Sequence, residues 1–279
     1  MALARNMGIE LGRIGIWQHE SVFTPDLARE LEELGYGAIW LGGSPDGDLV
    51  KAEELLDATK TIKVATGIVN IWKDDAATVA ESYKRIEAKH PGRFLLGIGA
   101  GHREHTAEFK KPYAALVEYL DALDAAGVPV EGRVLAALGP KVIKLAGDRT
   151  AGAHPYLMTP EHTRQAREIL GDGPLLAPEQ KVVLEADPAK AREIGRPGVK
   201  FYLSLVNYTN SLRKLGFTDE DLAGEGSDKL IDALAVHGDA ETVARGVTAH
   251  LEAGADHVNI QVLNQDPLPV YRALAAILL

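Results

Sequence analysis

The sequence predicts an α/β fold, a closed (β/α)8 TIM barrel, and three observations lead to it. Short apolar segments alternate with helical segments from one end of the chain to the other. The alternation yields eight strands, each followed by a helix, and no linker rich in Pro, Gly or Ser interrupts it. The chain has 279 residues, and one barrel needs about 250. We therefore expect a single barrel domain over residues 1–279.

The expected strands are short apolar runs bounded by glycine or polar residues. They cover residues 13–17, 36–41, 62–70, 94–98, 134–137, 151–156, 181–185 and 256–262. One helix joins the third strand to the fourth, which implies parallel pairing through a right-handed crossover. Both strands end in Gly, Asn or His, and parallel barrels place their chemistry at the carboxyl ends of the strands. The segment 62–101 therefore locates a candidate active site.

The helices carry recognisable start signals. Thr24 followed by Pro25 is typical of an N-cap with proline at the first helical position, and Gly35 ends that helix. Further helices are expected over residues 49–59, 76–89, 108–126, 141–146, 240–253 and 269–279. Another helix is expected to start at 159–162 and to continue over 166–170. The stretch 196–236 is too long for one helix. We expect two or three extra helices there, between strands seven and eight, broken at Gly216 and at 224–226.

Composition limits the possible partners and chemistry. The chain has 30 Lys and Arg against 40 Asp and Glu, a net charge of −10, which argues against nucleic acid or an anionic membrane as partner. It has no cysteine, which excludes disulfides, thiolate catalysis and cysteine-bound zinc. No apolar run approaches the ~18 residues of a membrane span, and residues 1–12 lack a signal-peptide core. We expect a cytoplasmic protein that binds small molecules.

Two glycine-containing segments are ambiguous on their own. Gly97, Gly99 and Gly101 resemble a dinucleotide fingerprint, but His102 stands where its third glycine is needed. The segment is either a tight strand exit or a place where the backbone approaches a flat ligand. Ser44 follows two glycines, but the pattern is not a nucleophile elbow, so we expect Ser44 to be a loop or ligand-contact residue.

Histidines at strand ends are the candidates for acid–base chemistry. His102 follows the fourth strand and His19 follows the first, and each is either a functional contact or a solvated loop residue. His102 and His105 have helical spacing for a shared metal, but only Glu104 and Glu108 stand nearby, so we expect no metal. We interpret the remaining histidines, His154 among them, as structural or surface residues.

The turn Leu138-Gly139-Pro140 leads directly from a strand into a helix. Free backbone amides at a helix start favour a phosphate group. The alternative is an ordinary turn between strand and helix, and the residues alone do not decide between them.

Several segments together resemble the bacterial luciferase-like flavin and deazaflavin oxidoreductases, most of all the actinobacterial branch that uses coenzyme F420. They span nearly the whole chain in the expected order: 62–70, 90–102, 138–147, 152–156, 175–180 and 254–258. The family fold is the (β/α)8 barrel, which the strand count reached independently. A homodimer is expected from the same resemblance.

The resemblance also implies where a cofactor binds. Its ring would lie across the carboxyl mouth of the barrel, against a bulge in strand three with a cis peptide bond between Gly67 and Ile68. The contacts implied for the ring and the phosphate are Gly67, Ile68, Ala100, Gly101, His102, Ala137, Leu138, Gly139 and Pro140. Ser44 is expected to contact the cofactor as well.

One departure from the family bears on function. Its sugar-phosphate dehydrogenases carry an Asp-His pair after strand two, where this chain has Gly43 and Ser44. We expect an F420-dependent oxidoreductase that moves a hydride between the deazaflavin and a small organic substrate, with His102 as the first catalytic candidate and His19 as the second. The alternatives are an FMN-dependent monooxygenase and a non-catalytic deazaflavin-binding protein.

Overall fold

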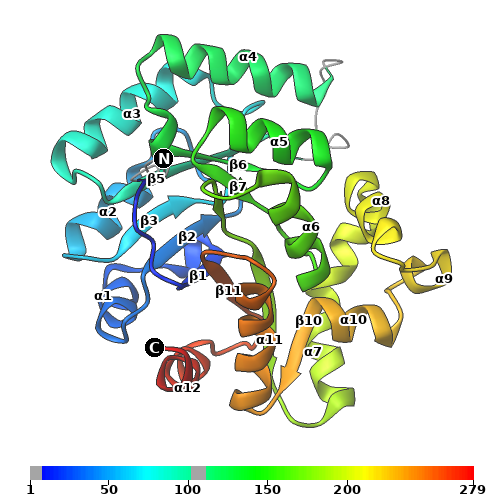
Figure 1. The fold of residues 1–279 in the computed structure, drawn as a ribbon. Coiled ribbons are helices and arrows are strands. Elements are labelled where there is room, and N and C mark those ends of the chain that lie inside the picture. Colours follow the sequence, from blue (N-terminus) through cyan, green and yellow to red (C-terminus); the bar gives the residue numbers. More distant parts are fainter. Residues whose placement is uncertain (1–7, 102–110) are drawn as a thin grey trace.

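A computed structural model describes residues 8–101 and 111–279, and the chain forms a curled sheet surrounded by helices (Figure 1). All recorded strand pairs are parallel. The strands are β1 (Ile14–His19), β2 (Ala38–Gly42), β3 (Lys63–Thr66), β4 (Val69–Asn70), β5 (Phe94–Gly99), β6 (Arg133–Ala136), β7 (Gly152–His154), β8 (Leu175–Leu176), β9 (Glu179–Leu184), β10 (Ala235–Gly238) and β11 (Val258–Val262).

The sheet closes into a barrel because β8 pairs with β7, whereas β9, the next strand in the chain, pairs with β11. The hydrogen-bonded order runs from β9 through β11, β1, β2, β3, β5, β6 and β7 to β8. Only Ala177 and Pro178 separate β8 from β9 in the chain, and the amide of Asp256 donates to the carbonyl of Leu176 at 2.9 Å. The predicted barrel is therefore confirmed.

Two strands differ from the prediction in an informative way. The seventh was expected over 181–185, but β8 and β9 together begin at Leu175. The first part of this strand was missed because of Pro178. Proline donates no hydrogen bond to a neighbouring strand and usually argues against a strand interior. Here it lies where the chain changes partner, and its carbonyl still accepts from the amide of Asn259 at 2.9 Å. The short strand β10 was not expected; it pairs with β9.

The predicted break in strand three is present. β3 ends at Thr66 and β4 begins at Val69, and the bond between Gly67 and Ile68 is cis, as expected. β3 pairs with β2 and β5, whereas β4 pairs with β5.

Most helices begin within a residue or two of the predicted starts, but α4 begins at Pro112, where 108 was expected, and α7 begins at Pro188, where no helix was expected. Thr24 caps the first helix by accepting a hydrogen bond from the amide of Leu27 at 3.1 Å. The helices are α1 (Pro25–Glu33), α2 (Val50–Ala58), α3 (Ala76–Lys89), α4 (Pro112–Ala125), α5 (Pro140–Arg149), α6 (Pro160–Leu170), α7 (Pro188–Lys200), α8 (Val206–Lys214), α9 (Asp219–Leu222), α10 (Asp228–Leu234), α11 (Ala240–Glu252) and α12 (Leu268–Leu278), with the 3-10 turn η4 (Phe201–Ser204). The extra helices between strands seven and eight break at Gly216 and at 224–226, as predicted.

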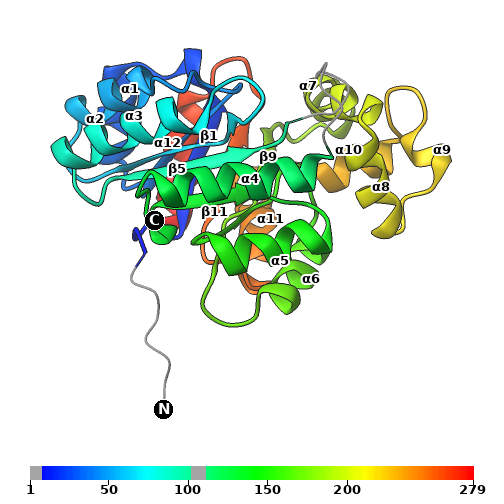
Figure 2. The same cartoon turned by 90° about the horizontal axis from the view of Figure 1, so that it is seen from above.

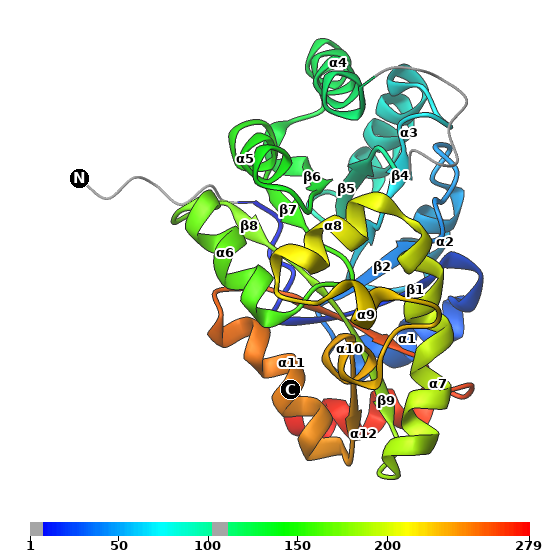
Figure 3. The ribbon, with the colours of Figure 1, turned by 90° about the vertical axis from the view of Figure 1, so that its right-hand side faces the viewer.

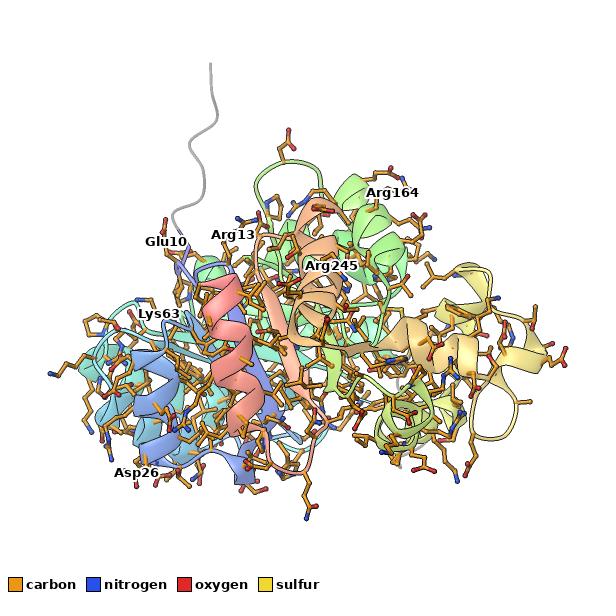
Figure 4. All side chains as sticks on the ribbon, turned by 90° about the horizontal axis from the view of Figure 1, so that it is seen from below. Glu10, Arg13, Asp26, Lys63, Arg164 and Arg245 are labelled. Atoms are coloured by element: carbon orange, nitrogen blue, oxygen red, sulfur yellow. The ribbon has the colours of Figure 1, made fainter. Side chains whose placement is uncertain are left out.

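These extra helices form a group of their own. Figure 2 shows α8, α9 and α10 together at one end of the molecule, and Figure 3 shows α8 in front of the sheet. Their apolar side chains, including Leu205, Leu212 and Leu230, form a core separate from the one between sheet and outer helices. Charged side chains such as Asp26, Arg164 and Arg245 are exposed (Figure 4). Within residues 8–101 and 111–279, no helix combines the length and apolarity of a membrane span.

Candidate active site

A cavity of about 830 Å³ lies at the carboxyl ends of the strands, between the barrel and the segment η4–α8. Its described lining consists of glycine, small apolar, aromatic and amide residues, with one serine and one histidine. These residues are Trp17, Gly43, Ser44, Gly67, Ile68, Asn70, Ala100, Gly101, Pro112, Tyr113, Leu116, Ala136, Ala137, Leu138, Gly139, Val142, His154, Tyr156, Phe201, Tyr202, Val206, Asn207, Tyr208 and Asn210.

Most of the predicted cofactor contacts lie on this cavity. They are Ser44, Gly67, Ile68, Ala100, Gly101, Ala137, Leu138 and Gly139. Pro140 lies just behind them as the first residue of α5. His102 falls outside the described residues. The exits of strands two, three, four and five thus meet at one place, because parallel strands in a barrel end on the same side.

His19 lies behind the rim of the cavity. Its Nδ1 is 2.8 Å from the hydroxyl oxygen of Ser21, and its side chain is exposed. A Cβ atom added to Gly43 would lie 2.4 Å from Nε2 of His19, so the imidazole packs directly against the backbone of a lining residue. His19 is therefore adjacent to the cavity, but it is not among the lining residues.

The inner end of the cavity is built around Gly67. The indole of Trp17 lies across Gly42 and Gly67, since a Cβ at Gly42 would come within 2.2 Å of it. A Cβ at Gly67 would lie 2.6 Å from Nε1 of Trp17 and 3.1 Å from Nε2 of His154. Glycine at position 67 therefore lets the indole and the imidazole pack directly against the backbone.

His154 is held rigidly in one tautomer. Its Nδ1 lies 2.7 Å from the carbonyl oxygen of Ala177, an acceptor, so Nδ1 carries the hydrogen and donates. The ring stacks on Trp40 with centroids 4.3 Å apart. Burial lowers the pKa of His154 to about 4, with the nearby His257 acting in the same direction. The imidazole is neutral at pH 7, and Nε2 is a hydrogen-bond acceptor.

Trp17 is a hydrogen-bond donor, whereas Nε2 of His154 is an acceptor. Its side chain is 7% exposed, and its Nε1–H has no hydrogen-bond partner in the described part of the chain. A buried donor without a partner costs free energy of about 1–3 kcal/mol, which a ligand acceptor would offset. The ring of Tyr156 packs against the indole at a centroid distance of 4.9 Å.

Three tyrosines form one wall of the cavity over a buried charge. The hydroxyl of Tyr202 donates to that of Tyr156 at 3.0 Å, and Tyr156 donates to Oε1 of Gln261 at 2.8 Å. Tyr208 packs against Tyr202 with ring centroids 4.9 Å apart. The ammonium of Lys181 lies 3.8 Å from the ring centroid of Tyr156.

No side chain covers the backbone at Gly139, in the turn predicted to bind phosphate. Gly139 is the N-cap of α5, without a side-chain cap, and a Cβ there would meet nothing within 4 Å. Pro140 has no N–H, and the amides of Val142 and Ile143 donate to the carbonyl of Gly139. The backbone N–H of Lys141, in the first turn of α5, therefore has no acceptor within the helix and is free to bind a ligand oxygen.

Sequence reasoning missed the aromatic and histidine part of this lining. His154 was interpreted as structural or surface, yet it is 2% exposed and lines the cavity. Its position at the end of a predicted strand is the signal that pointed to it. Trp17 and Tyr156 carried no comparable signal, because an aromatic residue in a strand is usually a core residue.

Solved structures of similar fold include F420-dependent and FMN-dependent enzymes. An F420-dependent secondary alcohol dehydrogenase, solved with an F420-acetone adduct, superposes with a TM-score of 0.75 at 16% identity, over 96% of this chain and 98% of that chain. The F420-dependent tetrahydromethanopterin reductase of Methanopyrus kandleri gives 0.70 at 15% identity, over 95% and 98%. The FMN-bound oxygenating constituent of 3,6-diketocamphane monooxygenase from Pseudomonas putida gives 0.66 at 16% identity, over 95% and 97%.

Two curated relatives match shorter segments. An N-acetyl-S-alkylcysteine monooxygenase of Bacillus subtilis (strain 168) is 32% identical over 114 residues, which cover 36% of this chain and 34% of the relative. The uncharacterized protein YvbT of the same organism is 32% identical over 81 residues, 26% of this chain and 24% of the relative. This chain thus matches about a third or less of each relative's length. The family model described as luciferase-like monooxygenase matches residues 13–257, most of the chain, and the protein therefore belongs to this family of enzymes.

Proposed function

We propose that this protein is an F420-dependent oxidoreductase, which moves a hydride between a deazaflavin held across the cavity and a small organic substrate. The observation that carries the proposal is the convergence of four strand exits, rich in glycine, on one cavity of about 830 Å³, whose described lining residues include no Asp, Glu, Lys or Arg. Flat ring systems bind in such cavities, which are mostly apolar and contain a few placed polar groups.

The residues present fit a flavin-type group. The backbone at Gly67, Gly101 and Gly139 presents no side chain to the cavity, so a ring or its chain can approach it closely. A Cβ at Gly101 would lie 2.7 Å from Nδ2 of Asn70, so this exit is also too close-packed for a larger residue. Trp17 Nε1 supplies a buried donor without a partner.

Particular residues have particular tasks in this proposal. Ile68 and Ala100 would contact the ring, and the turn at Leu138 and Gly139 would bind the phosphate through the amide of Lys141 at the start of α5. A bound deazaflavin or flavin supplies the hydride-transfer chemistry. The tyrosine wall excludes water from the inner end of the cavity, which strengthens every hydrogen bond made there.

The second candidate is an FMN-dependent monooxygenase. The curated relative of 32% identity is a monooxygenase, and one structure of similar fold holds FMN. The third is a deazaflavin-binding protein without catalysis, which the presence of Gly43 and Ser44 in place of an Asp-His pair favours. A fluorescence titration with F420 and with FMN separates the first two candidates, and turnover of any substrate excludes the third.

The phosphate turn gives the proposal a site-specific test. Gly139→Glu should weaken cofactor binding about tenfold, ~1.4 kcal/mol, because a carboxylate would repel the phosphate. Gly139→Gln, of equal size and without charge, is the matched control and should bind within about threefold of wild type. Equal affinity of all three proteins would place the phosphate elsewhere, with Thr159 at the start of α6 as the next position to test.

A homodimer is part of the same proposal. Light scattering at micromolar concentration should give about 60 kDa, twice the 30.0 kDa of the chain. A mass near that of the single chain would contradict it.

A further inference from the structure

We propose that an aromatic strip, formed by Trp17, Tyr156, Tyr202 and Phe201, binds the elongated apolar body of the substrate, and that Phe201 at its outer end selects substrates by length. The inference rests on the proposed function, which supplies the cofactor and the reaction. It names the substrate class of that site and one residue that determines specificity.

The four rings form one continuous row along the cavity wall. The ring centroids of Trp17 and Tyr156 are 4.9 Å apart, those of Tyr156 and Tyr202 are 5.1 Å apart, and those of Tyr202 and Phe201 are 5.1 Å apart. Aromatic rings at this spacing pack directly against each other. All four residues line the cavity, so the aromatic strip presents it with a continuous surface.

The aromatic strip leads from the inner end of the cavity to its mouth. Trp17 packs against Gly67 at the inner end and is 7% exposed. Tyr156 and Tyr202 are half-buried, and Phe201 is 53% exposed. Exposure therefore rises along the row, and a ligand that extends outward from the inner end meets the rings in this order.

The aromatic strip is separate from the proposed cofactor contacts. Trp17 belongs to β1, Tyr156 follows β7, and Tyr202 and Phe201 belong to η4. The proposed cofactor contacts come from the exits of the strands between β1 and β7 in the barrel. Both sets border the same cavity, so the aromatic strip is a wall that the substrate can occupy beside the cofactor.

The hydroxyl groups of the two tyrosines are engaged within the wall. Tyr202 donates to the hydroxyl oxygen of Tyr156 at 3.0 Å, and Tyr156 donates to Oε1 of Gln261 at 2.8 Å. The ammonium of Lys181 donates to the same Oε1 at 2.9 Å, which fixes that atom as an acceptor. Because both hydroxyl hydrogens are used in this way, the aromatic strip offers a ligand carbon surface, which favours an apolar body.

The outer end of the aromatic strip lies in an apolar rim. Phe201, Val206 and Tyr113 all line the cavity, yet they are 53%, 60% and 44% exposed. Tyr113 belongs to α4 and Val206 to α8, so separate parts of the chain build this rim. Large apolar side chains that gather at the mouth of a cavity mark a ligand-binding groove. A long substrate reaches this rim from the inner end, whereas a short one does not.

Substitutions at position 201 test the outer end alone. Phe201→Ser removes the outermost ring, and Phe201→Leu keeps an apolar side chain there. Val50→Ser is the matched control, because Val50 is 59% exposed, lies on α2 and is not among the lining residues of this cavity. Exposed positions such as these tolerate substitution, so all three variants should fold like wild type.

The test uses the protein loaded with whichever cofactor binds, and calorimetric titration with methyl ethyl, methyl butyl, methyl hexyl and methyl octyl ketone. In wild type the dissociation constant should fall about threefold for each added methylene group, because each one buries more apolar surface. In Phe201→Ser methyl ethyl ketone should bind within about twofold of wild type, whereas methyl octyl ketone should bind about tenfold more weakly. Phe201→Leu should bind methyl octyl ketone within about threefold of wild type, and Val50→Ser should match wild type throughout.

Several results would overturn the inference. One is a wild-type affinity that stops rising beyond methyl butyl ketone, which would mean a compact substrate site. Another is a Phe201→Ser variant that weakens all four ketones equally or none of them, since Phe201 would then not read length. A third is the loss of ketone binding when cofactor saturates the protein, because the aromatic strip would then belong to the cofactor.

The same titrations separate this inference from the proposed function. If neither F420 nor FMN binds, the proposed function fails, and the ketone series with the cofactor-free protein still decides whether the aromatic strip binds an elongated apolar ligand. If a cofactor binds but affinity for the ketones does not depend on their length, the inference alone fails.

Discussion

The ammonium of Lys181 lies 3.1 Å from the carboxylate of Glu179, and neither side chain is more than 1% exposed. The other donors of the ammonium meet Oε1 of Gln261 at 2.9 Å and the ring face of Tyr156 at 3.8 Å. Burial lowers the pKa of Lys181 and raises the pKa of Glu179, whereas the charge of each partner opposes the shift of the other. Three acceptors around Lys181 indicate that the pair is ionised.

Replacing Lys181 by Met should therefore be strongly destabilising. The carboxylate of Glu179 would stay buried with the amide of Leu157, 3.0 Å away, as its remaining partner. Breaking a buried pair in this way costs about 3–5 kcal/mol. The free energy of unfolding in urea measures the loss.

The double variant Lys181→Met with Glu179→Gln is the control. It leaves no buried charge at positions 179 and 181, and the Gln oxygen can still accept from Leu157, so most of the lost stability should return. A double variant as unstable as the single one would show that packing, and not the uncompensated charge, is what Lys181 contributes.

Stability should fall as the pH drops from about 6.5 to 4. Burial lowers the pKa of both His154 and His250 to about 4, from an ordinary value of 6.5. In that window the unfolded chain binds protons that the folded protein does not, so the stabilisation is complete above pH 6.5 and is lost as the pH falls towards 4. Each histidine contributes on the order of 1–3 kcal/mol. Tm measured across this range checks the direction.

His250→Gln should make that pH dependence shallower. It removes one of the buried histidines while keeping an amide that can bond to Thr163 or Gln180. Burial also lowers the pKa of His162 and His257, so part of the slope remains. An identical slope in this variant would mean that other groups cause the loss.

Gly67→Ala should harm both stability and ligand binding. Its Cβ would lie 2.6 Å from Nε1 of Trp17, too close for any real contact, so the indole must shift. Overpacking of this kind costs about 1–3 kcal/mol. Gly139→Ala is the matched control, because a Cβ there meets nothing within 4 Å and the φ of −84° suits alanine. We expect it to fold within about 0.5 kcal/mol of wild type. Urea unfolding of both variants, with cofactor titration, tests the contrast.

His102 stays the first catalytic prediction from the sequence. His102→Ala should keep cofactor affinity within about threefold, ~0.7 kcal/mol, and lose about 100-fold in turnover if His102 transfers a proton. Near wild-type turnover would turn attention to His19.

The sequence by itself predicted most of the elements in order and the strand exits that line the cavity. The Thr24 cap, the strand periodicities and the glycines at strand exits are local signals, because hydrogen bonding and backbone freedom over a few residues decide them. The break in strand three at Gly67 and the turn at Gly139 were predicted from the same kind of local signal.

Only the tertiary structure decided which side chains meet. Trp17, Gly67 and His154 come from strands far apart in the chain, and their contact depends on how the barrel closes and on which side of each strand faces inward. The exchange of partners at Pro178, which extends the seventh strand, likewise appears only once β7 and β11 are in place. The burial of Lys181 next to Glu179 depends on Tyr156, Tyr202 and Gln261, which come from other parts of the chain. Such long-range neighbours leave no pattern in a single sequence, because periodicity records which face is apolar but not what lies against it.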